Sequence, residues 1–190
     1  YRDFAALRQI NPDVAAWLTL DGTHVDHPVV KGTDNFEYLD RDFYGKTYAG
    51  GTLFLDEQCP KDFAQEYQLI HGHHMAGGAM FGDLKKYLDK NFFHKNKRGQ
   101  LLTPKGRYDL EIIAAGIFDA YDSKIYSING KKNRPMESFR RCRRKRPVRG
   151  KFRDRLLCLS TCSGDMDDRR IVVFCRMTGP EESHTEGRKE

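Results

Sequence analysis

Short apolar segments of strand length recur along this chain, and helices do not alternate with them. Seven or eight such segments can be distinguished, over residues 15–20, 27–30, 52–55, 67–71, 100–103, 107–118, 156–161 and 171–177. A parallel α/β sheet requires a helix between successive strands, so this pattern disfavours that class. Many short strands with few helices are typical of a closed or half-closed β-barrel. We therefore predict a mainly β fold.

Helical spacing of apolar residues is confined to a few segments. It predicts a short helix over 3–10, ended by Asn11-Pro12, and a second helix over 80–88. Residues 34–39 are expected to form one or two helical turns, and residues 135–145 a basic helix that ends before Pro147. A chain of 190 residues is long enough for one sizeable core and short for two. We expect a single domain over 1–178 and a polar, loose tail over 179–190.

The positive charge of the chain is concentrated in one segment. The formal net charge is +6, yet residues 140–155 hold ten basic side chains against the single acid Asp154, a local charge of +9. The rest of the chain therefore carries a charge of −3. A basic nucleic-acid-binding barrel is one function that this segment could support. Aromatic side chains do not interleave with these charges, which disfavours the stacking surface that such proteins use.

The cysteines favour free thiols over a disulfide framework, because their number is odd and no CxxC pair is present. The five are Cys59, Cys142, Cys158, Cys162 and Cys175. Cys162 lies where an apolar strand runs into a polar loop, so the strand can hold its thiol while a substrate reaches it. Cys158 lies inside the apolar part and is expected to be a packed thiol, which is also the ordinary alternative for Cys162.

Three histidines, His71, His73 and His74, directly follow the apolar strand Gln68-Leu69-Ile70. A neutral imidazole can accept a thiol proton, and an imidazolium can return a proton to a leaving amine. The same pattern could hold zinc, because His71 and His73 would share one face of a strand, with Cys162 or Asp56 as a further ligand. A zinc-dependent hydrolase that uses the three histidines is therefore an alternative.

Arg169 and Arg170 open the strand that follows the Cys162 loop. In a hairpin the start of one strand lies near the end of the preceding one, so an arginine here can reach the region of Cys162. A guanidinium is always charged and offers several donors, which suits stabilisation of an oxyanion. Arg170 is the preferred candidate because it directly precedes the Ile-Val-Val run, and an exposed strand-edge charge is the ordinary alternative.

In their order and spacing these motifs resemble the sortase family, most closely its class B. The resemblance extends over residues 10–177, and its motifs are specific in combination although each is weak alone. The stretches that carry it are Asn11-Pro12-Asp13-Val14-x-x-Trp17, Asp26-His27-Pro28-Val29-Val30, Asp34-Asn35-x-x-Tyr38-Leu39, Phe54-Leu55-Asp56, Leu69-Ile70-His71-Gly72-His73-His74-Met75, Met80-Phe81-x-x-Leu84, Leu159-Ser160-Thr161-Cys162 and Arg170-Ile171-Val172-Val173.

The resemblance implies a closed eight-stranded β-barrel with an N-terminal helix and a helical insertion, within residues 119–151, before the Cys-bearing strand. It implies a cysteine transpeptidase of Gram-positive bacteria that cleaves a C-terminal sorting signal of surface proteins, usually after Thr. The acyl group would pass through a thioacyl enzyme to an amine, which is a cell-wall precursor in anchoring enzymes or a pilin lysine in polymerising ones. No cofactor, metal or nucleic acid is implied.

The resemblance also assigns roles to residues of this chain. The catalytic Cys, His and Arg of the family fall on Cys162, His73 and Arg170. The residues that flank the substrate groove in class B correspond to Asn35, Leu39, Ser160 and Thr161.

This chain departs from the family pattern near the catalytic positions. Sortases commonly have Tyr before Gly-His, where this chain has His71, and the loop from Cys162 to Arg170 is short, with seven residues. Some class B members carry an acidic residue in that loop as a proposed third catalytic member. The acids available there are Asp165, Asp167 and Asp168, and the pattern does not choose among them.

No apolar run approaches the roughly 20 residues that span a bilayer. The sequence opens at Tyr1 without the apolar stretch of a signal peptide. The resemblance therefore leads us to expect a location on the extracellular face of the cytoplasmic membrane, with attachment through an N-terminal anchor outside this sequence.

Overall fold

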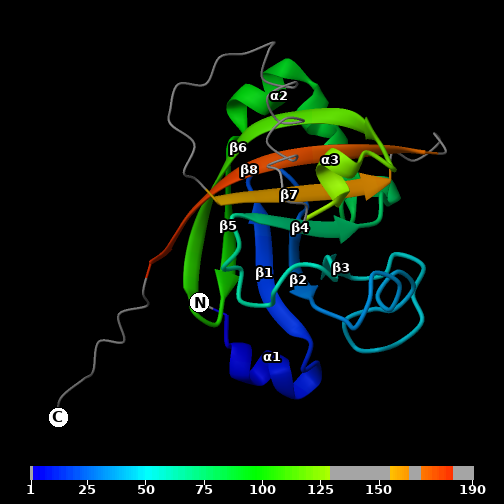
Figure 1. Ribbon diagram of the computed structural model, residues 1–190, viewed down its shortest axis with the longest axis vertical. Helices are drawn as coiled ribbons and strands as arrows, with labels where there is room; N and C mark the ends of the chain where they lie inside the picture. The colour runs from blue at the N-terminus through cyan, green and yellow to red at the C-terminus, as the bar shows by residue number, and fades with distance from the viewer. Residues whose placement is uncertain (1, 129–154, 163–167, 182–190) are drawn as a thin grey trace.

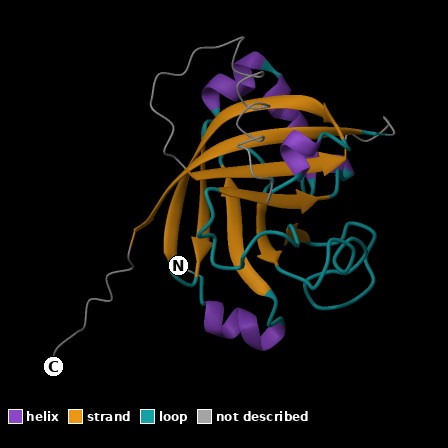
Figure 2. Ribbon diagram, in the orientation of Figure 1, coloured by secondary structure: helices purple, strands orange, loops and turns teal. Residues whose placement is uncertain are grey.

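The strands form one closed β-barrel (Figures 1 and 2). The computed structural model describes residues 2–128, 155–162 and 168–181. Within these ranges eight strands close the barrel in the order β1-β2-β3-β4-β7-β8-β6-β5. Their bounds are β1 Val14–Leu20, β2 Asp26–Val30, β3 Leu53–Leu55, β4 Tyr67–Gly72, β5 Arg98–Thr103, β6 Gly106–Asp119, β7 Arg155–Cys162 and β8 Arg169–Glu181. The predicted mainly β, eight-stranded closed barrel is confirmed.

All eight strands contribute side chains to one continuous apolar core. Leu18 of β1, Leu69 of β4, Leu159 of β7 and Val173 of β8 are fully buried in it. Burial of one such side chain stabilises the fold by about 1.5–3 kcal/mol. The apolar segments noted in the sequence are therefore the strands of the barrel. Their buried side chains pack together in its core and stabilise the arrangement of the strands.

Three short α-helices accompany the described strands: α1 Phe4–Ile10, α2 Lys90–Lys95 and α3 Ser123–Tyr126. The predicted N-terminal helix is confirmed as α1, and the Asp3 carboxylate caps it by accepting hydrogen bonds from the amides of Ala5 (2.9 Å) and Ala6 (3.1 Å). Helix α3 lies between β6 and β7, as expected for an insertion before the Cys-bearing strand. The basic helix predicted over 135–145 lies outside the described residues.

Two helical predictions differ in detail from the structure. The segment predicted as a helix over 80–88 winds as a 3₁₀-helix, η2 Gly82–Leu88, after a shorter one, η1 Ala76–Gly78, and before α2. The apolar face is nonetheless buried, at Leu84 and Tyr87. Residues 34–39 form a hydrogen-bonded turn, from the Leu39 amide to the Phe36 carbonyl (3.1 Å), and no helix. The Asp34 carboxylate accepts from two amides of this turn and so competes with helical hydrogen bonding.

Strand β8 runs further than the sequence pattern indicates. The apolar pattern ends at Met177, but β8 continues to Glu181 because β6 extends alongside it and pairs Arg107 with Glu181. The boundary between a domain over 1–178 and a tail over 179–190 stays a prediction, and residues 182–190 lie outside the described ranges. Among the described residues, no helix has the length and apolar character needed to cross a membrane.

Candidate active site

Strand β4 meets the hairpin of β7 and β8, which is distant from it in the sequence, and the three strands run side by side. Strand β7 lies between the other two, parallel to β4 and antiparallel to β8. The register pairs Gly72 of β4 with Thr161 of β7, and the residues that follow them are His73 and Cys162. Across the other edge of β7, the backbone of Cys162 lies opposite Arg170. The barrel topology therefore brings the three candidate catalytic positions to neighbouring strand ends.

A groove with a volume of about 330 Å³ opens beside these strand ends. Six of the residues assigned to the site from the sequence line it: Asn35, Leu39, His73, Ser160, Thr161 and Arg170. The remaining lining residues among those described are Phe54, Asp56, Gln58, His71, Gly72, Ala120 and Tyr126. Cys162, the seventh assigned residue, is placed by its backbone pairing with Arg170. The groove is thus built from the loop before β3, the ends of β3, β4, β7 and β8, and α3.

His73 is held by the loop between β2 and β3. Its Nε2–H donates a hydrogen bond to the backbone carbonyl oxygen of Leu39, at 2.6 Å. The ring is half-buried, and the backbone carbonyl of the same residue accepts from the Phe81 amide (2.9 Å). Leu39 was expected as a substrate-groove residue, and the structure shows that its main chain also bonds the candidate catalytic histidine.

The ring of His71 is hydrogen-bonded to a buried carboxylate in the groove wall. Its Nε2 lies 2.8 Å from Oδ2 of Asp56, whose side chain is 4% exposed. The Asn35 amide also donates to Asp56 (3.1 Å), and the Gln58 backbone amide donates to its second oxygen (2.9 Å). Burial opposes ionisation of Asp56, but these hydrogen bonds outweigh it and hold the pKa of Asp56 below its usual value.

The ring of His71 stacks against two aromatic rings. The ring centroid of Phe54 lies 5.2 Å away and that of Tyr126, from α3, lies 6.3 Å away. The Tyr126 hydroxyl lies 2.9 Å from the Ser160 hydroxyl, so α3 is tied to β7 at the groove. Burial raises the pKa of Tyr126, which therefore stays protonated. Sequence reasoning missed Tyr126 altogether, because it lies in a weakly patterned segment after the long strand β6.

Ser160 and Thr161 contribute differently to the groove, although both are buried. Ser160 is engaged by Tyr126, as described above. The Thr161 hydroxyl is buried without a hydrogen-bond partner in the described part of the chain. A buried hydroxyl without a partner is unfavourable, and this distinguishes Thr161 from Ser160.

The two arginines at the start of β8 lie in different environments. Arg170 lines the groove and is half-buried, and one of its guanidinium N–H groups donates to the Arg169 carbonyl (3.1 Å). Arg169 is exposed and does not line the groove. Of the three acids weighed in the preceding loop, Asp168 is exposed and its carbonyl accepts from the Ala120 amide (2.6 Å), whereas Asp165 and Asp167 lie outside the described residues.

Three other thiols are buried away from solvent and are not part of a disulfide: Cys59, Cys158 and Cys175. Burial raises the pKa of Cys59 to about 12 and raises that of Cys175 as well. Such thiols stay protonated and unreactive near neutral pH. The prediction that Cys158 is a packed thiol is confirmed. Cys142 lies outside the described residues.

The zinc alternative receives no support from the histidines. The ring of His71 bonds Asp56 and the ring of His73 bonds the Leu39 carbonyl, whereas His74 pairs with Met80 through its backbone. Among the described residues, no three His, Cys, Asp or Glu side chains are grouped so that they could hold a metal ion. The ligand set that a zinc hydrolase requires is therefore not assembled by them.

Comparison with known proteins identifies relatives of one kind, although no family model matches the sequence. The chain is 27% identical to Sortase B of Staphylococcus aureus over 180 residues, which cover 92% of this chain and 74% of that protein. It is 33% identical to Sortase B of Listeria monocytogenes over 108 residues, which cover 57% and 44% of the two chains.

Solved structures of similar proteins superpose over nearly the whole chain. A class B sortase of Streptococcus pyogenes that is involved in pilus biogenesis is 35% identical, with a TM-score of 0.80 over 93% of this chain and 98% of that one. Sortase B of Clostridium perfringens is 29% identical, with a TM-score of 0.81 over 93% of this chain and 100% of that one.

Proposed function

The chain belongs to class B of the sortase family, and on that premise we propose that Cys162, His73 and Arg170 carry out its cysteine transpeptidase reaction. The observation that carries this assignment is the strand register. Arg170 lies opposite Cys162 across the β7–β8 pair, and Arg170 shares one groove with His73. No other arginine lines that groove within the described ranges.

In the proposed reaction the thiolate of Cys162 attacks the carbonyl carbon of the scissile peptide bond. A C–S bond forms, and the carbonyl π electrons move onto oxygen to give an oxyanion. The guanidinium of Arg170 stabilises this charge, which develops only in the transition state and the intermediate. Collapse of the intermediate breaks the C–N bond and leaves a thioacyl enzyme.

His73 would transfer the protons that both half-reactions require. As an imidazolium it protonates the departing amine, and the neutral ring then removes a proton from the incoming amine, which attacks the thioester. The second half-reaction restores the thiolate and forms a new amide bond. Proton transfer of this kind typically contributes about 10²–10⁴-fold to the rate.

We propose that the substrate is a C-terminal sorting signal of a surface protein or pilin, bound by Asn35, Leu39, Ser160 and Thr161. The relatives include a Staphylococcus aureus sortase B solved in complex with substrate and a sortase B solved in complex with triglycine. A small primary amine, from a cell-wall precursor or a pilin lysine, is the acceptor that this chemistry requires. Sortases are cell-surface enzymes of Gram-positive bacteria, and we place this one on the extracellular face of the cytoplasmic membrane.

The assignment of Cys162 is tested by incubating the protein with a panel of signal peptides that place Thr before the scissile bond, with triglycine as the amine. Mass spectrometry is expected to show a thioacyl adduct on Cys162 and a peptide–triglycine product. Cys162→Ala should lose both while keeping the far-ultraviolet circular dichroism spectrum. Cleavage retained by Cys162→Ala would exclude the mechanism, and Cys158→Ala serves as the matched thiol control.

A further inference from the structure

The segment between β2 and β3, residues 31–52, is a long irregular loop that delivers one backbone group to the active site (Figure 1). That group is the Leu39 carbonyl, whose oxygen lies 2.6 Å from Nε2 of His73. A carbonyl oxygen can only accept a hydrogen bond, so Nε2 must carry the proton in this contact. In a neutral imidazole one nitrogen is protonated and the other holds the lone pair. The contact therefore assigns the basic lone pair to Nδ1.

We propose that the Leu39 carbonyl is a positioning group that fixes the tautomer and orientation of His73, so that Nδ1 is the atom that exchanges protons during the reaction. The proposal rests on the catalytic role assigned to His73 above. The thiol proton moves from sulfur to Nδ1, giving an imidazolium that keeps its Nε2–H on Leu39, and the Nδ1 proton then passes to the leaving amine. The loop acts as a backbone counterpart of the carboxylate that orients histidine in many triads.

The backbone of Gly51 lies close against the Leu39 carbonyl. A Cβ at Gly51 would lie 2.4 Å from the Tyr38 carbonyl oxygen and 2.5 Å from the Leu39 carbonyl oxygen, far inside van der Waals contact. The Thr52 amide, next along the chain, donates to the Tyr38 carbonyl (3.1 Å). Any side chain at position 51 must therefore displace the peptide group that bonds His73.

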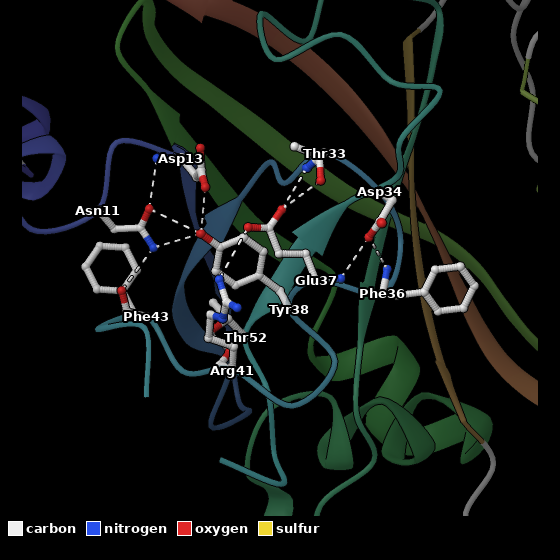
Figure 3. Close-up of polar contacts among 10 residues, drawn as sticks. All are labelled: Asn11, Asp13, Thr33, Asp34, Phe36, Glu37, Tyr38, Arg41, Phe43 and Thr52. Carbon is white, nitrogen blue, oxygen red and sulfur yellow. Dashed lines mark hydrogen bonds and ion pairs between the residues drawn. The ribbon is translucent and has the colours of Figure 1, made fainter. Parts of the chain in front are cut away.

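Tyr38 anchors the same stretch to the body of the barrel. Figure 3 shows its ring directed toward the segment before β1, where its hydroxyl donates to the Asp13 carboxylate (2.7 Å) and accepts from the Asn11 amide (3.1 Å). Asn11 also donates to the Phe43 carbonyl (3.0 Å), so both sides of the loop are tied to it. The side chain of Tyr38 is 4% exposed. Two motifs that are distant in the sequence, Asn11-Pro12-Asp13 and Tyr38-Leu39, thus form one support for the histidine.

The tautomer is measured directly by nitrogen NMR on protein with ¹⁵N-labelled histidine, with the His73→Gln spectrum assigning the His73 signals. At a pH where the ring is neutral, we expect Nε2 to show the shift of a protonated nitrogen and Nδ1 that of an unprotonated one. The opposite assignment, or averaged shifts from a mixture, would overturn the proposal. This measurement needs no substrate, so it tests the tautomer of His73 independently of the proposed function. Failure to cleave any signal peptide would count against the proposed function and would leave the NMR result unchanged.

The role of the Leu39 carbonyl is tested with alanine variants of two glycines. Both substitutions strain the backbone, but only one of them places a Cβ against the Leu39 carbonyl. Gly51 and Gly45 both have positive φ, +57° and +82°, but a Cβ at Gly45 meets nothing within 4 Å. Both alanine substitutions should lower the midpoint temperature of thermal unfolding. Only Gly51→Ala should also reduce kcat with the best signal peptide and triglycine, by roughly ten- to a hundredfold, as for a catalytic group displaced by about 1 Å. Equal kcat in the two variants would contradict the role of Leu39.

A second pair covers the case in which Gly51→Ala fails to fold. Tyr38→Phe removes the buried hydroxyl, and Tyr44→Phe removes one from a side chain that is 70% exposed in the same loop. We expect Tyr38→Phe to lower kcat several-fold and to move the His73 nitrogen shifts toward each other, with Tyr44→Phe like the wild type. If Tyr38→Phe lowered only thermal stability and left kcat and the nitrogen shifts unchanged, Tyr38 would stabilise the loop without positioning His73, which would contradict its proposed role.

Discussion

Asp56 shows how one buried side chain can organise a polar groove wall. It accepts hydrogen bonds from His71, Asn35 and the Gln58 amide, and its backbone carbonyl accepts from the Lys31 ammonium (2.9 Å). A buried carboxylate is stable only when its lone pairs are satisfied in this way. His71 belongs to this network because its imidazole nitrogen can donate to Asp56 while its ring stacks on Tyr126. These two contacts explain how the groove wall accepts a histidine at position 71.

Asp56→Asn should therefore destabilise the fold. Loss of the charged acceptor is expected to lower the free energy of unfolding by about 2 kcal/mol, in the range for hydrogen bonds to buried charged groups. Asp40→Asn, at an exposed aspartate, should change it little. Urea unfolding followed by fluorescence measures both values. Equal stability of the two variants would show that the Asp56 network contributes nothing.

The lowered pKa of Asp56 also predicts a pH dependence. A carboxyl group whose pKa is depressed in the folded state contributes stability above its unfolded pKa, about 3.9, and loses it as pH falls through the folded value. The stability difference between wild type and Asp56→Asn should accordingly shrink as pH falls below about 4. A difference that instead widened in acid would mean that folding raises the pKa of this group.

At the scale of elements, α3 is a four-residue helix that forms one wall of the groove. It is too short to be stable alone, and tertiary contacts hold it. Ile125 is fully buried, the Asp122 carboxylate caps the helix at the Lys124 amide (2.9 Å), and the Tyr67 hydroxyl donates to the Ile125 carbonyl (3.1 Å). Tyr126 adds a further link, from its hydroxyl to Ser160 on β7.

Tyr126→Phe should loosen that wall while keeping the ring stacked on His71. We expect a loss of about 1 kcal/mol of stability, faster amide exchange over residues 120–127, and a higher KM for signal peptides with a smaller change in kcat. Hydrogen-exchange mass spectrometry and steady-state kinetics report these effects. Tyr121→Phe, at a side chain that is 78% exposed, is the control, and the interpretation is wrong if the two variants behave alike.

At the scale of the whole molecule, closure of the barrel creates the site. Strands β4 and β7 lie far apart in the sequence, and the described elements between them include α2, β5, β6 and α3, yet they pair in parallel over six residue pairs. Their fully buried side chains, among them Leu69, Ile70 and Leu159, belong to the same core as those of β1 and β8. The relative position of the three proposed catalytic residues therefore depends on the stability of the entire barrel.

Leu159→Ala tests that dependence from within the core. Truncation of a fully buried leucine should lower the free energy of unfolding by about 2–5 kcal/mol, whereas Leu88→Ala, at a side chain that is 43% exposed, should have a smaller effect. Chemical denaturation of both variants measures the difference. Similar losses in the two would mean that the barrel core is less tightly packed than the burial of Leu159 indicates.

Much of this protein could be predicted from local sequence patterns. The apolar segments and the turn residues identified the strands of a β-barrel, and apolar spacing identified the N-terminal helix, because strand and helix periodicities are properties of neighbouring residues. The motif order identified the family, and with it the groove residues Asn35, Leu39, Ser160 and Thr161. The position of Cys162 at a strand end and of His73 directly after another strand was likewise visible in the sequence.

Only the tertiary structure decided which of these pieces meet. The hairpin of β7 and β8 was expected to place Arg170 near Cys162, and the structure fixed the register in which the two residues face each other. The pairing of β4 with β7 and the bonds from His71 to Asp56 and from His73 to Leu39 join residues that are distant along the chain. No periodicity records such contacts, because they arise when the barrel closes and the loop between β2 and β3 packs against it. Local patterns thus determined the strands and the candidate chemistry, while closure of the sheet determined the geometry of the groove.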